Sequence, residues 1–185
     1  MAVYPFIKHI PNILTLARIF FVFIIGILMF IDNSFSRVFS VVLAVLACIT
    51  DFFDGKIARK YNVVSDFGRC MDPIADKALV MTLMVMLVYL EKVWVFTAII
   101  ILFREFVVAG LREFIAKEKN ITIPVSKLAK VKTASQMISL IFLMIVGSNM
   151  ILSLIGNILL TFSALLSIIT GMKYIFSVRR FLINK

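Results

Sequence analysis

Residues 51–76 read DFFDGKIARKYNVVSDFGRCMDPIAD, and the acidic side chains of this segment include two closely spaced pairs. Asp51 and Asp54 are three positions apart, which places them on one face of a helix. Asp72 and Asp76 are four positions apart and share a helical face in the same way. Each pair adjoins one end of a long apolar run, so this segment is predicted to join two membrane helices.

The link between the two helices is predicted at Gly68, and Pro73 fits only near the start of the second helix. If the helices form an antiparallel pair, the four carboxylates converge at one depth. Their negative charges would then repel one another and be costly to desolvate. Two divalent cations balance this charge, and oxygen ligands without a Cys/His cluster favour Mg²⁺ or Mn²⁺ over zinc. The predicted ligands of the two ions are Asp51, Asp54, Asp72 and Asp76.

Composition indicates an integral membrane protein. The 185 residues are 62% hydrophobic with a mean hydropathy of +1.08, which is too apolar for a soluble domain. Residues 1–185 are predicted to form a single all-α membrane domain, because the length suffices for about six membrane helices of roughly 20 residues each. A short interfacial segment over residues 1–10 is expected first. The six transmembrane helices are then expected at 13–31, 37–59, 70–90, 93–117, 127–147 and 150–178.

Lysine and arginine predict the orientation of these helices. If the amino terminus is cytoplasmic, Arg37 and Lys92 are the only two of the 20 Lys and Arg side chains that fall on the outer side. Both termini and the four aspartates are then cytoplasmic, at the inner (cytoplasmic) membrane of the cell. The net charge of +10 is explained by this topology and by anionic headgroups. No nucleic-acid partner is therefore expected.

A second group of charges follows in the fourth predicted helix. Arg104 and Glu105 interrupt an apolar run, where charges are expensive enough to suggest a role. The alternative is an internal salt bridge with Glu113 or Asp66, and the sequence leaves both interpretations open. Lys and Arg side chains that converge on a cavity suit phosphate. The basic candidates for such a site are Arg104, Arg112, Lys130 and Lys132.

A stripe of small residues runs along the sixth predicted helix. Ser163, Ser167 and Gly171 follow one another at four-residue spacing, which allows close helix contact. The contact is either within the chain or between chains.

Two motifs resemble those of a known family. The pattern Asp51-x2-Asp54-Gly55-x2-Ala58-Arg59-x8-Gly68-x3-Asp72-x3-Asp76 resembles, at every fixed position, the signature of the CDP-alcohol phosphatidyltransferases. The run Pro11-Asn12-Ile13-Leu14-Thr15-x2-Arg18 is similar to the amino-terminal motif of the bacterial phosphatidylglycerophosphate synthases in that family. The pairs Arg104-Glu105 and Arg112-Glu113 also look like that branch, as does the run Lys130-Val131-Lys132-Thr133-x2-Gln136.

The resemblance implies transfer of the phosphatidyl group from CDP-diacylglycerol to sn-glycerol 3-phosphate, giving phosphatidylglycerol phosphate and CMP. It also implies that Asp76 deprotonates the attacking hydroxyl and that the protein is a homodimer in membrane lipid. The residues expected at CDP-diacylglycerol are Asn12, Thr15, Gly55, Ala58, Arg59 and Gly68. Those expected at the acceptor phosphate are Arg104, Arg112, Lys130 and Lys132.

Two alternative functions are compatible with part of this pattern. Another member of the same family, such as a cardiolipin, phosphatidylserine or phosphatidylinositol-phosphate synthase, would share the aspartate signature. The basic motifs favour a phosphorylated acceptor, which argues against serine. A cation-coupled transporter would use the carboxylates as an ion path. The clustering of all four aspartates at one membrane face, with no inverted repeat, argues against a transporter.

Overall fold

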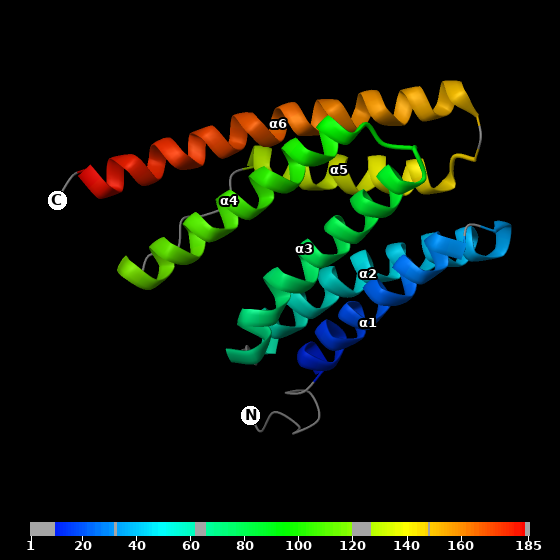
Figure 1. Cartoon of the computed structure of the whole chain (residues 1–185). Coiled ribbons are helices and arrows are strands. Elements are labelled where there is room, and N and C mark those ends of the chain that lie inside the picture. The colour runs from blue at the N-terminus through cyan, green and yellow to red at the C-terminus, as the bar shows by residue number, and fades with distance from the viewer. Residues whose placement is uncertain (1–9, 32, 62–65, 120–126, 148, 184–185) are drawn as a thin grey trace. The chain divides into compact units, whose positions relative to one another are not determined.

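Six α-helices make up the part of the chain that the computed structural model describes, which is residues 10–31, 33–61, 66–119, 127–147 and 149–183 (Figure 1). Within those ranges there is no strand, so the all-α prediction is confirmed. The interfacial segment predicted at 1–10 lies outside the described residues, except that α1 begins at Ile10. The bounds of the helices are α1 Ile10–Ile31, α2 Ser34–Tyr61, α3 Asp66–Tyr89, α4 Val95–Lys119, α5 Lys127–Ile145 and α6 Met150–Ile183.

The helices belong to two compact units, residues 1–86 and residues 87–185. The first unit contains α1, α2 and most of α3. The second contains the last residues of α3 together with α4, α5 and α6. The single domain predicted over 1–185 stays a prediction.

In the first unit, α1 and α2 form an antiparallel hairpin whose tight turn is closed by Asn33. The Asn33 side-chain oxygen accepts a hydrogen bond from the Ser36 amide at 2.7 Å, and the Ser36 hydroxyl oxygen accepts one from the Asn33 amide at 3.0 Å. This reciprocal capping satisfies amides that a helix start leaves without partners. It explains why a connection of so few residues suffices between two membrane helices.

Helix α3 runs parallel to α1, because contacts between the two helices advance in the same direction along both. Thr15 contacts Asp72 near one end of the pair, and Gly26 approaches Thr82 further along. Between the helices of this unit lies an apolar core to which Ile25, Met29, Leu79, Leu83 and Met84 contribute. Since α2 is antiparallel to α1, α2 and α3 are antiparallel to each other, which is the condition under which the four carboxylates were expected to converge.

The predicted position of the link between α2 and α3 is wrong. Helix α3 begins at Asp66, so Gly68 lies within its first turn and is buried there rather than breaking the chain. A glycine costs about 1 kcal/mol relative to alanine in a helix interior, which packing readily offsets. Pro73 also lies inside α3, in its second turn. Its ring nitrogen cannot donate to the Arg69 carbonyl, so one bond of the helical ladder is missing there.

In the second unit, α6 packs against α4 in parallel and against α5 in antiparallel orientation. Asn157 of α6, which is buried, fixes the turn between α3 and α4 to this core. Its Oδ1 accepts from the Trp94 amide at 3.1 Å, and its Nδ2 donates to the Lys92 carbonyl at 2.8 Å. The Lys92 ammonium in turn donates to the Val146 carbonyl at 2.8 Å, just beyond the end of α5. One amide side chain therefore ties the turn to α6.

Gly156 brings α6 close to α5, and replacing it with alanine is expected to destabilise the protein. An added Cβ would lie 2.5 Å from Leu143 Cδ2 and 2.7 Å from Leu143 Cγ, well inside van der Waals contact. Leu143 is fully buried and cannot turn away freely. Overpacking of this kind typically costs about 1–3 kcal/mol. Thermal unfolding of the detergent-solubilised protein should show a lower Tm for Gly156→Ala.

Gly110→Ala is the matched control for this measurement. Gly110 is exposed on α4, and a Cβ there meets no atom within 4 Å outside the backbone of its own helix. Alanine should leave Tm unchanged or raise it, because it favours a helix by about 1 kcal/mol over glycine. A Gly156→Ala protein as stable as the Gly110→Ala protein would contradict the close packing of α5 on α6.

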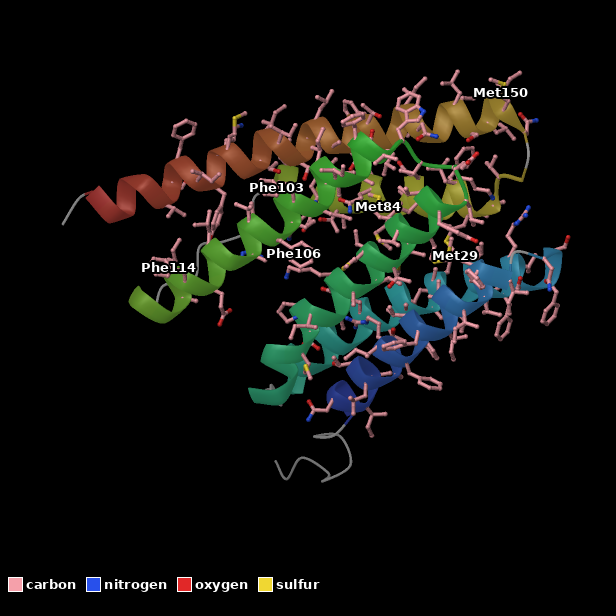
Figure 2. All side chains as sticks on the ribbon, in the orientation of Figure 1. Met29, Met84, Phe103, Phe106, Phe114 and Met150 are labelled. Atoms are coloured by element: carbon pink, nitrogen blue, oxygen red, sulfur yellow. The ribbon has the colours of Figure 1, made fainter. Side chains whose placement is uncertain are left out.

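The helices carry the apolar surface of a multi-pass membrane protein. Within the described residues, four of them contain segments long and apolar enough to cross a membrane: Asn12–Ile31, Ser34–Asp51, Leu128–Ile145 and Met150–Val178. Helices α3 and α4 are interrupted by the charges assigned above to the site. Figure 2 shows the side chains along each helix, with Met29 and Met84 buried and Phe103 and Met150 exposed. Large exposed apolar side chains along spanning helices are expected where lipid is the solvent.

Candidate functional site

Two buried polar side chains of α1 contact the acidic residues of the predicted metal site in the first unit. Thr15 and Arg18 lie one turn apart on the same face of α1, and both are completely inaccessible to solvent. A buried guanidinium is costly unless it is paired with negative charge. The pairing comes from aspartates at the end of the α2 apolar run and in the first half of α3.

Arg18 bridges two of the predicted metal ligands. Its Nη1 lies 2.8 Å from Asp51 Oδ1 and donates a hydrogen bond to Asp76 Oδ1 at 2.7 Å. The two carboxylates come from α2 and α3, so one nitrogen of α1 holds groups from both other helices. The arginine is fully buried, whereas the Asp51 and Asp76 side chains are 47% and 52% exposed. The carboxylates therefore remain open on the side away from Arg18.

The third described aspartate is held by the same helix. The Thr15 hydroxyl donates to Asp72 Oδ1 at 2.6 Å, and Asp72 is half-buried. Asp51, Asp72 and Asp76 thus all contact one face of α1. The backbone of α2 continues through the fourth predicted ligand and the predicted nucleotide contacts. Their side chains lie outside the described residues: Asp54, Gly55, Ala58 and Arg59.

The donor set fits a hard divalent cation. Carboxylate oxygens are the ligands that Mg²⁺ and Mn²⁺ prefer in proteins. Among the side chains that the structure describes, no three His, Cys, Asp or Glu groups are already arranged as ligands of one ion. Arg18 contacts both Asp51 and Asp76. Each carboxylate has two oxygens and about four acceptor positions. A contact to Arg18 through Oδ1 is therefore compatible with coordination through the rest of the group.

The charged residues of α4 form an ion-pair network in the second unit. Arg104 donates through Nε to the Ser167 carbonyl and through Nη2 to the Thr170 hydroxyl of α6, each at 2.9 Å. Its Nη1 lies 3.3 Å from Glu105 Oε1, and the same oxygen accepts from the Lys132 ammonium of α5. Lys132 is almost fully buried. Arg104 and Glu105 therefore take part in an internal salt bridge, the alternative that the sequence left open, and Lys132 is a partner of Glu105 in it.

The other two basic candidates are more exposed. The Arg112 guanidinium carbon lies 5.8 Å from the centre of the Tyr174 ring, within the range of a cation–π contact. Lys130 is exposed near the start of α5. Binding of the acceptor phosphate by Arg104, Arg112, Lys130 and Lys132 stays a prediction.

The small residues of α6 are used within the chain. Ser163, Ser167 and Gly171 are all buried, and the Ser163 hydroxyl donates to the Lys132 carbonyl at 3.2 Å. A Cβ at Gly171 would lie 3.2 Å from both Cγ and Nε of Arg104. The stripe therefore makes room for the polar side chains that join α6 to α4 and α5.

Two contacts go beyond what the sequence predicts. The amino-terminal motif includes Arg18 without indicating its contacts with Asp51 and Asp76, and the spacing of the charges does not indicate the pairing of Glu105 with Lys132. The available signal was a lone arginine in the apolar run of α1, one turn after a threonine, since an unpaired charge there is expensive. Its partners lie more than thirty positions away along the chain, which no helical spacing could indicate.

Comparisons with known proteins show a family to which most of this chain is similar. The family described as CDP-alcohol phosphatidyltransferase matches residues 8–171. A protein of Rickettsia typhi named CDP-diacylglycerol–glycerol-3-phosphate 3-phosphatidyltransferase is 49% identical over 170 residues, covering 90% of this chain and 95% of the relative. A protein of the same name from Wigglesworthia glossinidia brevipalpis is 33% identical over 171 residues, covering 91% of this chain and 93% of the relative.

Proposed function

This chain belongs to the CDP-alcohol phosphatidyltransferase family, and we therefore propose that it transfers the phosphatidyl group of CDP-diacylglycerol to sn-glycerol 3-phosphate. The products are phosphatidylglycerol phosphate and CMP. The observation that supports this choice most strongly is the 49% identity to a relative named for that reaction, over 95% of the relative's length. An alignment of that extent includes residues of both units, and the family match over residues 8–171 spans every residue of the predicted site.

The proposed chemistry uses the open side of the acidic cluster. Asp51, Asp54, Asp72 and Asp76 would hold two Mg²⁺ or Mn²⁺ ions. Bound there, the ions would neutralise the diphosphate of CDP-diacylglycerol and the charge that develops on the departing CMP. Asp76 takes the proton of the attacking hydroxyl. The hydroxyl oxygen then bonds to the phosphorus of the diacylglycerol phosphate while the bond from that phosphorus to the CMP oxygen breaks.

The remaining site residues bind and orient the two substrates. Small side chains at Gly55 and Ala58 would let the nucleotide approach the α2 backbone, and Arg59 would counter phosphate charge. The phosphate of the acceptor would be bound by basic residues of α4 and α5, for which Arg112 and Lys130 are the more exposed candidates. The residues that complete the CDP-diacylglycerol site are Asn12, Thr15 and Gly68.

A panel of acceptor alcohols tests the assignment. Purified protein in mixed micelles with CDP-diacylglycerol and Mg²⁺ is given sn-glycerol 3-phosphate, serine, inositol phosphate or phosphatidylglycerol, and CMP release is measured. Only glycerol 3-phosphate is expected to raise CMP release above the rate without an acceptor. Release with a different alcohol and none with glycerol 3-phosphate would assign the chain to another branch of the same family.

Topology and assembly complete the proposal. The distribution of Lys and Arg supports a site on the cytoplasmic side of the inner membrane with both termini inside. Labelling of single introduced cysteines in intact cells tests this topology, and labelling of both termini from outside would reject it. The homodimer is tested by light scattering of the detergent-solubilised protein, where a monomer mass would reject it.

A further inference from the structure

Helix α1 contributes a group that none of the predicted roles uses. Arg18 is completely buried, and its Nη1 is shared between Asp51 Oδ1 at 2.8 Å and Asp76 Oδ1 at 2.7 Å. The two aspartates are about half exposed, so water could solvate each of them without help from the arginine. The arginine therefore does not serve to solvate the carboxylates. It fixes the position of one carboxylate oxygen of α2 relative to one of α3.

We propose that Arg18 is a positioning residue that sets the geometry of Asp51 and Asp76 for binding a divalent cation. The proposal rests on the proposed function, in which both aspartates are metal ligands. Groups that hydrogen-bond metal-ligating side chains orient them, and removing such a group typically weakens metal binding or activity by about 10–100-fold. Arg18 suits this task because its planar guanidinium presents donors in a rigid arrangement.

Packing around Arg18 makes the bridge specific. It lies one turn from Thr15, whose hydroxyl holds Asp72 at 2.6 Å, so consecutive turns of α1 contact three of the four predicted ligands. Both α1 side chains are fully buried. Neither can shift far without displacing its neighbours, so the carboxylates are ordered from one rigid helix.

Charge and geometry make opposite predictions for loss of the arginine. If Arg18 contributed only its positive charge, removing it would make the net charge of the site more negative and would tighten cation binding. If it positions the ligands, removing it loosens the site and weakens cation binding. The sign of the change in Mn²⁺ affinity therefore separates the two effects without any measurement of catalysis.

The experiment measures Mn²⁺ binding to the purified full-length protein in detergent, without substrates, from the EPR signal of the free ion. Arg18→Gln keeps hydrogen-bond donors but loses the positive charge and the planar guanidinium group. It is expected to raise the Kd for Mn²⁺ by about 10–100-fold. Arg18→Lys, which keeps the charge on a shorter and less directional group, should show a smaller increase. Arg37→Gln is the matched control at the other end of α2 and should bind Mn²⁺ as the wild type does.

Thermal unfolding in EDTA keeps the result interpretable, because it reports folding without the metal. If Arg18→Gln does not fold, Arg18→Lys carries the test, and its Kd must exceed that of the wild type. Unchanged or tighter Mn²⁺ binding by a folded Arg18 variant overturns the positioning role while the proposed reaction stands. A wild-type protein that binds no Mn²⁺ or Mg²⁺ overturns the proposed metal site and the positioning role together.

Discussion

Asp76→Asn is expected to reduce CMP release by at least about 10²-fold and up to about 10⁴-fold, the usual contribution of a positioned general base. The substitution is nearly isosteric and retains an oxygen that can accept the hydrogen bond from Arg18, now 2.7 Å long. It removes the negative charge and the ability to take a proton. The protein should therefore insert and fold while the reaction stops. CMP release is followed with CDP-diacylglycerol and sn-glycerol 3-phosphate at saturation.

Glu91→Gln is the matched control for this change. Glu91 is exposed in the turn that follows α3, whereas Asp76 lies in the first half of that helix. The same carboxylate-to-amide change at Glu91 should therefore leave turnover unchanged. Size-exclusion profiles of both variants show whether the fold is retained. An Asp76→Asn protein that releases CMP at the wild-type rate would exclude Asp76 as the base.

Removing divalent cations is expected to abolish the activity, and adding Mg²⁺ or Mn²⁺ is expected to restore it. The proposed reaction brings a diphosphate next to Asp51, Asp72 and Asp76, so without cations like charges meet at the site. At an effective dielectric constant of about 20, two unit charges 4 Å apart repel by about 4 kcal/mol. Several such pairs would prevent productive binding. CMP release is measured after exhaustive EDTA treatment and again after repletion.

EDTA already saturated with Mg²⁺ is the control for this measurement, because it exposes the protein to the chelator without removing the metal. Activity should survive it. Full activity after exhaustive treatment with free EDTA would contradict a metal-dependent mechanism. In that case the four aspartates would need another source of positive charge, and Arg18 alone would be insufficient to balance them.

The helices were predictable from the sequence, because apolar runs of membrane length have few alternatives. Helical spacing alone was enough to predict that Asp72 and Asp76 share one face, and the pairing of Asp51 with Asp54 stays a prediction. The start of α3 was not predictable, because Gly68 can be accommodated within a helix when its surroundings are packed. Sequence spacing describes one helix at a time and does not show how different helices combine.

Partners across helices were the part that sequence could not supply. The bridge from Arg18 to Asp51 and Asp76 depends on how three helices pack, and so does the contact of Lys132 with Glu105. In both cases the sequence indicated that a buried charge needed a partner. Only the structure identifies that partner, and in the second unit it shows that Arg104 and Lys132, two of the predicted phosphate ligands, also belong to an internal ion-pair network.

The anchoring of the α3–α4 turn by Asn157 has a spectroscopic consequence. Asn157 accepts a hydrogen bond from the backbone amide of Trp94. Trp94 is the single tryptophan of the chain, and its side chain is half exposed. Intrinsic tryptophan emission therefore originates from this one turn and requires no introduced label. Changes in that emission with lipid composition or temperature report whether the turn is still seated on α6.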